Sequence, residues 1–317
     1  MPKPEPNSYR LVTDFTSLNR FLKRLPLSSP TIAEARAALA RKKYFAEIDL
    51  SNYFFQGGLR RGDCSYLAIQ HLFSGVYVYT ASPQGLKNSS EVSYERLGKV
   101  YGPIVQKNQL TRMADGLYVL ADSEEELLVN YEETLRKGGL AGFTFKPTKT
   151  VISPRNTTIF GWTLSDGEWK HQEHVISSLS RSERPNTVKQ LRSFSGSYKQ
   201  ISECVPEYAV LLSDFEQIVG SRGSAKRVIW TDKLKAAFNK AKEAVKSCRG
   251  VHFPMKTDRL ITSSDYSHQH KAIGGLMAII RQEEGKQKKL LGRHFSAKLD
   301  KNKSVWLPCE GEAFRVK

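Results

Sequence analysis

The stretch RMADGLYVLADS, residues 112–123, places one acidic residue, Asp115, in a tight turn between two apolar runs. Asp-Gly is a favoured dipeptide in short β-hairpin turns, so the stretch predicts two antiparallel strands with Asp115 at their tip. Taken alone, an aspartate at such a tip is more often a turn residue than a ligand. The segments on either side decide whether Asp115 has a further role.

The segments around this hairpin alternate between strand and helix patterns. Residues 43–56 begin as a strand, because apolar and acidic residues alternate there up to Asp49. Residues 65–85 predict a second hairpin that turns at Ser74-Gly75. Helices are expected over 28–43, 89–105 and 124–142. This order indicates an α+β fold in which helices back an antiparallel sheet.

The two flanks of this region have patterns of their own. Residues 9–19 predict a strand followed by a turn, and Ser29 is the candidate cap of the first helix. Short strands are expected over 143–169, and the chain becomes helical after residue 180. Three strands are expected from residue 258 onward, followed by a short helix that starts near Pro308.

The composition of the 317 residues is that of a folded protein, and the net charge is +17. No apolar run approaches a membrane span, so we expect no membrane partner. The four scattered cysteines fit reduced thiols and an intracellular location in the cytoplasm, the nucleus or virus-like particles. Most of the basic excess follows residue 180, which indicates either nucleic acid as a partner or a solvated lysine-rich surface.

Asp49 and Asp115 form a pair suited to metal-ion chemistry. One ends a strand and the other occupies a hairpin tip 66 residues later. Phosphoryl transfer uses two divalent ions about 4 Å apart, and Mg²⁺ prefers carboxylate oxygens. The pair therefore predicts a site for Mg²⁺ or Mn²⁺ if the sheet brings the two strands together.

Several segments are similar, in order, to the signature motifs of one family. They are YRLVTDFTSLN (9–19), FAEIDLSNYFFQ (45–56), ASPQGLKNS (81–89), RMADGLYV (112–119), GFTFKPTKT (142–150), IFGWTLS (159–165), RPNTVKQLRSFSGSYKQI (184–201), ITSSDYSHQHKAIGGLMAI (261–279) and WLPCEGEAF (306–314). The chain resembles the reverse transcriptase and RNase H region of gypsy-type long-terminal-repeat retrotransposons and their retroviral relatives.

The resemblance implies a right-hand polymerase followed by a truncated RNase H-like domain. Its parts would be partial fingers (1–40), a palm with an antiparallel sheet (41–170), a helical thumb and connection (171–250) and the RNase H-like remainder (251–317). Asp265 and Glu312 would be two metal carboxylates of that last domain. Because the family's other two carboxylates lie beyond residue 317, we expect no RNase H activity from this chain.

The resemblance also implies roles in the polymerase site. Asp49 and Asp115 would hold the metal ions, and Lys149 would protonate or steady the leaving pyrophosphate. Arg10 would pair with the triphosphate, because a guanidinium fork matches phosphate oxygens, unless it is a surface arginine of its strand. Phe54 would lie against the sugar and exclude a 2′-hydroxyl, unless it is a core aromatic.

Further residues would contact the nucleotide and the primer. Gln84 and Gly85 would touch the incoming nucleotide, unless they only form a turn. Phe160 and Trp162 would grip the primer end, unless they belong to the core.

The sequence departs from the family pattern at Met113, at Leu72 and at two positions with an expected cost. Gly116 replaces the second hairpin aspartate, whose loss is expected to lower the rate by on the order of 10²–10³. Ser195 replaces a buried leucine, at a cost of roughly 2–4 kcal/mol.

The sequence supports one leading function and two alternatives. The leading prediction is an RNA-directed DNA polymerase that uses an RNA template, a DNA primer or RNA–DNA hybrid, and dNTP. The first alternative is a catalytically inactive retroelement remnant that only binds nucleic acid. The second is an unrelated basic α+β protein, which a structure without a sheet joining Asp49 to Asp115 would indicate. The oligomeric state is left open.

Overall fold

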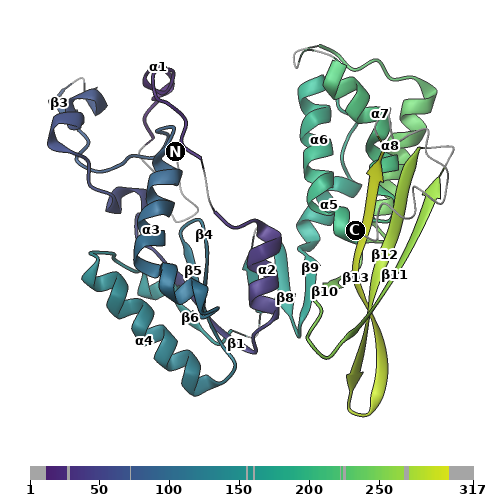
Figure 1. Ribbon diagram of the computed structural model, residues 1–317. Helices are drawn as coiled ribbons and strands as arrows, with labels where there is room; N and C mark the ends of the chain where they lie inside the picture. Colours follow the sequence, from purple (N-terminus) through teal and green to yellow (C-terminus); the bar gives the residue numbers. More distant parts are fainter. Residues whose placement is uncertain are drawn as a thin grey trace. The chain divides into compact units, whose positions relative to one another are not determined.

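The computed structural model describes residues 12–26, 29–71, 73–154, 156–159, 161–221, 223, 226–267 and 271–299. The chain divides into two compact units, Met1–Pro154 and Arg155–Lys317 (Figure 1). Residues 155–170, predicted as the end of the palm, therefore belong to the second unit, whereas the finer domain limits stay predictions. Within the described residues, none of the helices is both long and apolar enough to span a membrane.

The first unit is built on a four-stranded antiparallel sheet in the order β4-β5-β1-β6. Its strands are β1 (Tyr44–Asp49), β4 (Leu110–Met113), β5 (Gly116–Ala121) and β6 (Val151–Ile152). The predicted strand and hairpin are thus confirmed. A smaller hairpin of β2 (Ala68–His71) and β3 (Gly75–Val78) confirms the predicted turn at Ser74-Gly75.

The helices of the first unit are α1 (Thr16–Asn19), α2 (Ile32–Ala40), α3 (Ser89–Gln106) and α4 (Glu124–Leu140). Two predictions about the N-terminal flank are wrong. Of the strand and turn predicted over 9–19, the described residues 12–15 form no strand, and the short helix α1 stands where the turn was expected. The cap of α2 is Thr31, not Ser29. Thr31 caps better because Glu34 completes a capping box with it, which satisfies two backbone donors at once.

The core of the first unit lies where α3 and α4 pack on the sheet. Ala46 and Ile48 of β1 enter this core, so the two-residue period of a strand turns Glu47 and Asp49 to the other face. Gly138 lies inside α4. A Cβ there would collide with Tyr101, so its role is close packing.

Among its described residues, the second unit combines two sheets with four α-helices. One sheet has the order β10-β9-β8-β7 and the other the order β11-β12-β13. Their strands are β7 (Asn156–Ile159), β8 (Trp162–Ser165), β9 (Glu168–His171), β10 (Val251–His252), β11 (Arg259–Ser267), β12 (Ala272–Glu283) and β13 (Lys286–Lys298). The predicted three strands from residue 258 are therefore confirmed.

The helices of the second unit are α5 (Glu173–Ser180), α6 (Val188–Gln200), α7 (Tyr208–Ser221) and α8 (Asp232–Val245). Their apolar faces form one core around Phe194, Phe215 and Phe238. Ser195 is buried beside them, at 5% exposure, and its hydroxyl has no hydrogen-bond partner in the described structure. The position is therefore buried, as expected for the family's leucine, but in this chain it holds a hydroxyl group.

Candidate active site

Asp49 and Asp115 lie side by side at one end of the first sheet. Asp49, the last residue of β1, is paired with Gly116 of β5. The next backbone N–H, that of Leu50, donates to the carbonyl oxygen of Asp115 at 3.1 Å. The register of the two strands thus brings together aspartates 66 residues apart. This arrangement excludes the alternative in which no sheet joins them.

The turn that carries Asp115 differs from the expected Asp-Gly turn. Met113 pairs with Gly116, so Ala114 and Asp115 are the two central residues. Ala114 has a φ of 53°, in the left-handed region that the first central position of a tight hairpin needs. Gly116 is already part of β5, so the turn does not require a glycine at this position.

The ring of Tyr118 occupies the space next to Gly116. A Cβ added at Gly116 would lie 3.2 Å from the Tyr118 hydroxyl oxygen and 3.2 Å from its ring edge. Burial raises the pKa of Tyr118, and the negative charges of Glu47, Asp115 and Asp49 raise it further. The hydroxyl therefore stays protonated beside the two aspartates, where a second hairpin carboxylate would have added negative charge.

Lys149 is held against Asp49. Its short helix η3 (Pro147–Lys149) follows Lys146, whose N–H donates to the Asp49 carbonyl oxygen at 2.8 Å. The Lys149 ammonium donates to Asp49 Oδ2 at 2.9 Å, while the Asp49 side chain keeps 25% of its surface exposed. A cation that binds Asp49 would share this carboxylate with Lys149 or displace the ammonium.

Glu47 is a neighbour of the site that sequence reasoning missed. It lies on the same face of β1 as Asp49 and pairs with Tyr118 across the sheet. Its Oε1 is buried and accepts no hydrogen bond from any described residue, and burial raises its pKa. The two-residue spacing from Asp49 was the available signal, but it was used only to predict the strand.

Three of the residues predicted to contact the nucleotide are described, and all three lie in the first unit. Phe54 is in the short helix η1 (Tyr53–Gln56) and packs partly against the core, so both of its predicted roles stay open. Gly85 has a φ of +92°, and its carbonyl accepts from Asn19 Nδ2 at 2.9 Å. Gln84 is half-buried in the same turn. Arg10 lies outside the described residues.

A comparison with protein families matches residues 1–164 to the model "Reverse transcriptase (RNA-dependent DNA polymerase)". The match covers more than half of the chain and includes Asp49, Asp115 and Lys149. The chain belongs to the reverse transcriptase family. Members of this family use divalent metal ions.

The relatives of this reverse transcriptase chain are polyproteins of mobile elements and viruses. It is 22% identical to the "Enzymatic polyprotein" of Cauliflower mosaic virus (strain D/H), over 90% of this chain and 42% of that one. It is also 22% identical to the "Retrovirus-related Pol polyprotein from transposon opus" of Drosophila melanogaster, over 99% of this chain and 32% of that one. The chain thus spans less than half the length of these relatives.

Solved structures of foamy viral protease-reverse transcriptase share the fold. The foamy viral protease-reverse transcriptase dRH in complex with double-stranded DNA has a TM-score of 0.78 at 18% identity. The match covers 98% of this chain and 52% of that one. The complex with RNA/DNA hybrid has a TM-score of 0.73 at 18% identity, covering 99% and 41%. The mixed α and β architecture is therefore that of a polymerase of this type.

The donor set of this reverse transcriptase fits a hydrated divalent ion. Nowhere in the described ranges do three or more His, Cys, Asp or Glu residues gather as a metal cluster. Two carboxylates are nevertheless enough for Mg²⁺, which keeps several waters and takes further oxygens from substrate phosphates. Asp49 and Asp115, at one end of the sheet, carry carboxylates that could supply such oxygen ligands.

The remaining predicted residues belong to the second unit. Trp162 is 3% exposed in β8, and its ring packs on His171. These surroundings are those of a core residue, which was the alternative to a role in the primer grip. Asp265 lies in β11, opposite Gly274. Phe160 and Glu312 lie outside the described residues, and their roles stay predictions.

Proposed function

We propose that this chain carries out RNA-directed DNA synthesis as the polymerase part of a retroelement polyprotein. The observation that supports this most is the β1–β5 register, which joins Asp49 to Asp115 at one sheet end. In this family fold, a pair of adjacent carboxylates can hold the divalent ions that clamp the attacking and leaving oxygens. The substrates would be an RNA template, a DNA primer or hybrid, and dNTP.

The side chains around the pair would orient the reactants. Asp49 and Asp115 would hold Mg²⁺ or Mn²⁺. Lys149, released from Asp49 Oδ2 when the ion binds, would donate a proton to the leaving pyrophosphate or neutralise it. Phe54 would rest against the sugar, while Gln84 and Gly85 would contact the incoming nucleotide from their turn, in which Gly85 has a φ of +92°.

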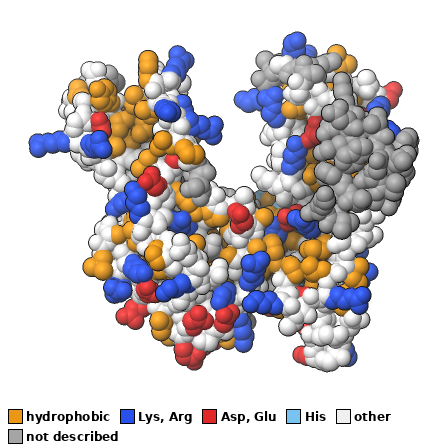
Figure 2. Space-filling model, in the orientation of Figure 1, with side chains coloured by type: hydrophobic (Ala, Val, Ile, Leu, Met, Phe, Trp, Pro, Cys, Tyr) orange, Lys and Arg blue, Asp and Glu red, His pale blue; other side chains and the backbone are white. Residues whose placement is uncertain are grey.

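The nucleic-acid partners are proposed on charge as well as on family. The net charge of +17 favours binding to phosphate backbones. On the face shown in Figure 2, lysine and arginine side chains lie on both units. An RNase H-like character of β11-β12-β13 and an intracellular location remain parts of this proposal that rest on the sequence.

Primer extension on an RNA template with Mg²⁺ or Mn²⁺ tests the proposal. The wild-type chain should extend the primer, whereas Asp49→Asn and Asp115→Asn should not. Asp122→Asn is the matched control, because Asp122 follows β5 at its far end and only bridges to Lys42 at the surface. Equal extension by all four proteins would overturn the proposed site.

A second function is favoured by the packing at Gly116. The Tyr118 ring fills the place next to the missing carboxylate, as expected if the site no longer catalyses. A chain of this kind would bind duplex or hybrid with an affinity that falls steeply as salt rises. Salt-sensitive binding without extension in either metal ion would select this function.

A further inference from the structure

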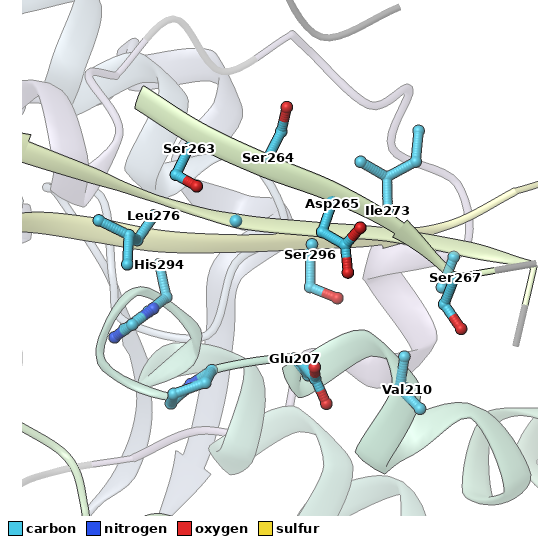
Figure 3. A pocket seen from close by; sticks show the side chains of 14 residues that line it. Glu207, Val210, Ser263, Ser264, Asp265, Ser267, Ile273, Leu276, His294 and Ser296 are labelled. Atoms are coloured by element: carbon cyan, nitrogen blue, oxygen red, sulfur yellow. The ribbon is translucent and has the colours of Figure 1, made fainter. Parts of the chain in front are cut away.

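A pocket of about 260 Å³ lies in the second unit, between the sheet β11-β12-β13 and the start of α7. Figure 3 shows Asp265 and Ser296 on the sheet side and Glu207 on the helix side, with their oxygens turned into the space between. None of these residues belongs to the site around Asp49. The pocket is therefore a separate feature of the chain.

The strand register explains why the pocket exists. Asp265 of β11 pairs with Gly274 of β12, and Gly274 pairs with Ser296 of β13. The three residues form one row across a single face of the sheet. Because the middle position has no side chain, a gap remains between the Asp265 carboxylate and the Ser296 hydroxyl.

Glu207 closes the open side of this gap. Its Cγ lies 3.9 Å from the position that a Cβ on Gly274 would take. The residue has a φ of 51°, and its carbonyl accepts the N–H of Val210 at 2.9 Å. The backbone thus fixes Glu207 at the first turn of α7, facing the middle of the row.

Ser296 is the second, independent sign of a ligand. It is only 6% exposed, and within the described part of the chain its hydroxyl has no hydrogen-bond partner. A buried hydroxyl without a partner destabilises the folded state, because it has given up its hydrogen bonds to water. Since this hydroxyl lines the pocket, its oxygen could bind a ligand placed there, such as a cation that prefers oxygen ligands.

The charge of the pocket determines the class of ligand. Asp265 and Glu207 each contribute a carboxylate, and His294 lines the same wall. The lining is therefore anionic in a chain whose net charge is +17.

We propose that Asp265, Glu207 and Ser296 hold one hydrated divalent cation, Mg²⁺ or Mn²⁺. Hard cations take oxygen ligands, and Mg²⁺ retains several waters when only one or two carboxylates bind it. The pocket volume leaves room for those waters. The bound ion ties the start of α7 to β11 and β13, so it stabilises the second unit.

This site differs from the one that the family resemblance predicts. There, Asp265 would act with Glu312, whereas here its partner is Glu207, which precedes α7. Two carboxylates and a hydroxyl make a binding site without a two-metal centre. The proposal stands whether or not the chain extends primers.

Manganese binding measured by electron paramagnetic resonance tests the proposal. The full chain carrying Asp49→Asn and Asp115→Asn is the parent, so that the polymerase pair contributes no binding. The parent should bind one Mn²⁺. Adding Glu207→Gln or Asp265→Asn should weaken binding at least tenfold, and Ser296→Ala should weaken it severalfold. Glu284→Gln, an exposed carboxylate at the β12–β13 turn, should leave binding unchanged.

Thermal unfolding provides the second measurement, which also shows that each variant folds. Mg²⁺ should raise the unfolding temperature of the parent above its value in EDTA, and this rise should vanish in Glu207→Gln. Unchanged Mn²⁺ affinity in a folded Glu207→Gln variant would overturn the proposal. So would loss of binding in Glu312→Gln but not in Glu207→Gln.

Discussion

The sheet end at Asp49 and the sheet face at Asp265 place carboxylates in different ways. In the first unit, strand register alone joins Asp49 to Asp115. In the second, Asp265 faces Gly274 on the next strand, and the second carboxylate comes from Glu207, outside the sheet. Strand motifs in the sequence therefore reveal both members of the first pair. In the second pair they reveal Asp265 but not Glu207.

Removal of Lys149 is expected to have the largest effect on the Asp49 site. Lys149→Ala takes away the cation beside Asp49 and the proposed proton donor, and such groups contribute about 10²–10⁴-fold to rate. Single-nucleotide incorporation should fall by that factor. Lys42→Ala breaks the Lys42–Asp122 ion pair of the same unit and should leave the rate unchanged. Equal losses in both variants would show that the effect is structural.

The packing behind the first sheet is tested at two adjacent glycines of α4. Gly138→Ala forces a methyl group against Tyr101 and Phe145, and overpacking of this kind costs about 1–3 kcal/mol. Gly139→Ala meets only open space and should stabilise the helix by about 0.5–1 kcal/mol. Urea unfolding measures both. A stable Gly138→Ala variant would contradict the close approach of α4 to Tyr101.

The core of the second unit should gain stability from a smaller change. Ser195→Ala removes a buried hydroxyl that no described residue satisfies, so unfolding should cost about 1 kcal/mol more. Ser193→Ala, on the exposed face of α6, should change the free energy of unfolding by less than about 0.5 kcal/mol. If both variants unfold like the wild type, Ser195 is satisfied in solution.

The smallest effect is expected at Glu47 and depends on pH. Burial raises its pKa above the ordinary 4.5, so the folded state favours the protonated form. The stability it contributes is fully present below pH about 4.5 and is lost as pH rises through the folded pKa. Glu47→Gln should therefore be more stable than wild type at pH 7 and equal to it at pH 4. A gain of the same size at both pH values would contradict burial as the cause.

The sequence predicted those parts of the molecule that depend on local pattern. Alternation located β1, and the turn residues located both hairpins, because period and turn chemistry are visible in a short window. The resemblance added Lys149, which the structure then placed on Asp49. Glu47, Tyr118 and Glu207 were missed, because cross-strand pairing and helix docking bring them to their sites from separate segments. The cap lies at Thr31 and not at Ser29 because only Thr31 has a glutamate three residues on, Glu34, to complete the capping box.

The most direct test of the account is single-nucleotide incorporation by wild type and Asp115→Asn on one primed RNA template. The wild-type chain should incorporate dNTP in Mg²⁺ or Mn²⁺, and the variant should be slower by about 10²–10³-fold or more, as expected for loss of a preorganised electrostatic group. Equal rates, or no incorporation by wild type in either metal ion, would contradict the claim that Asp49 and Asp115 form a working catalytic pair.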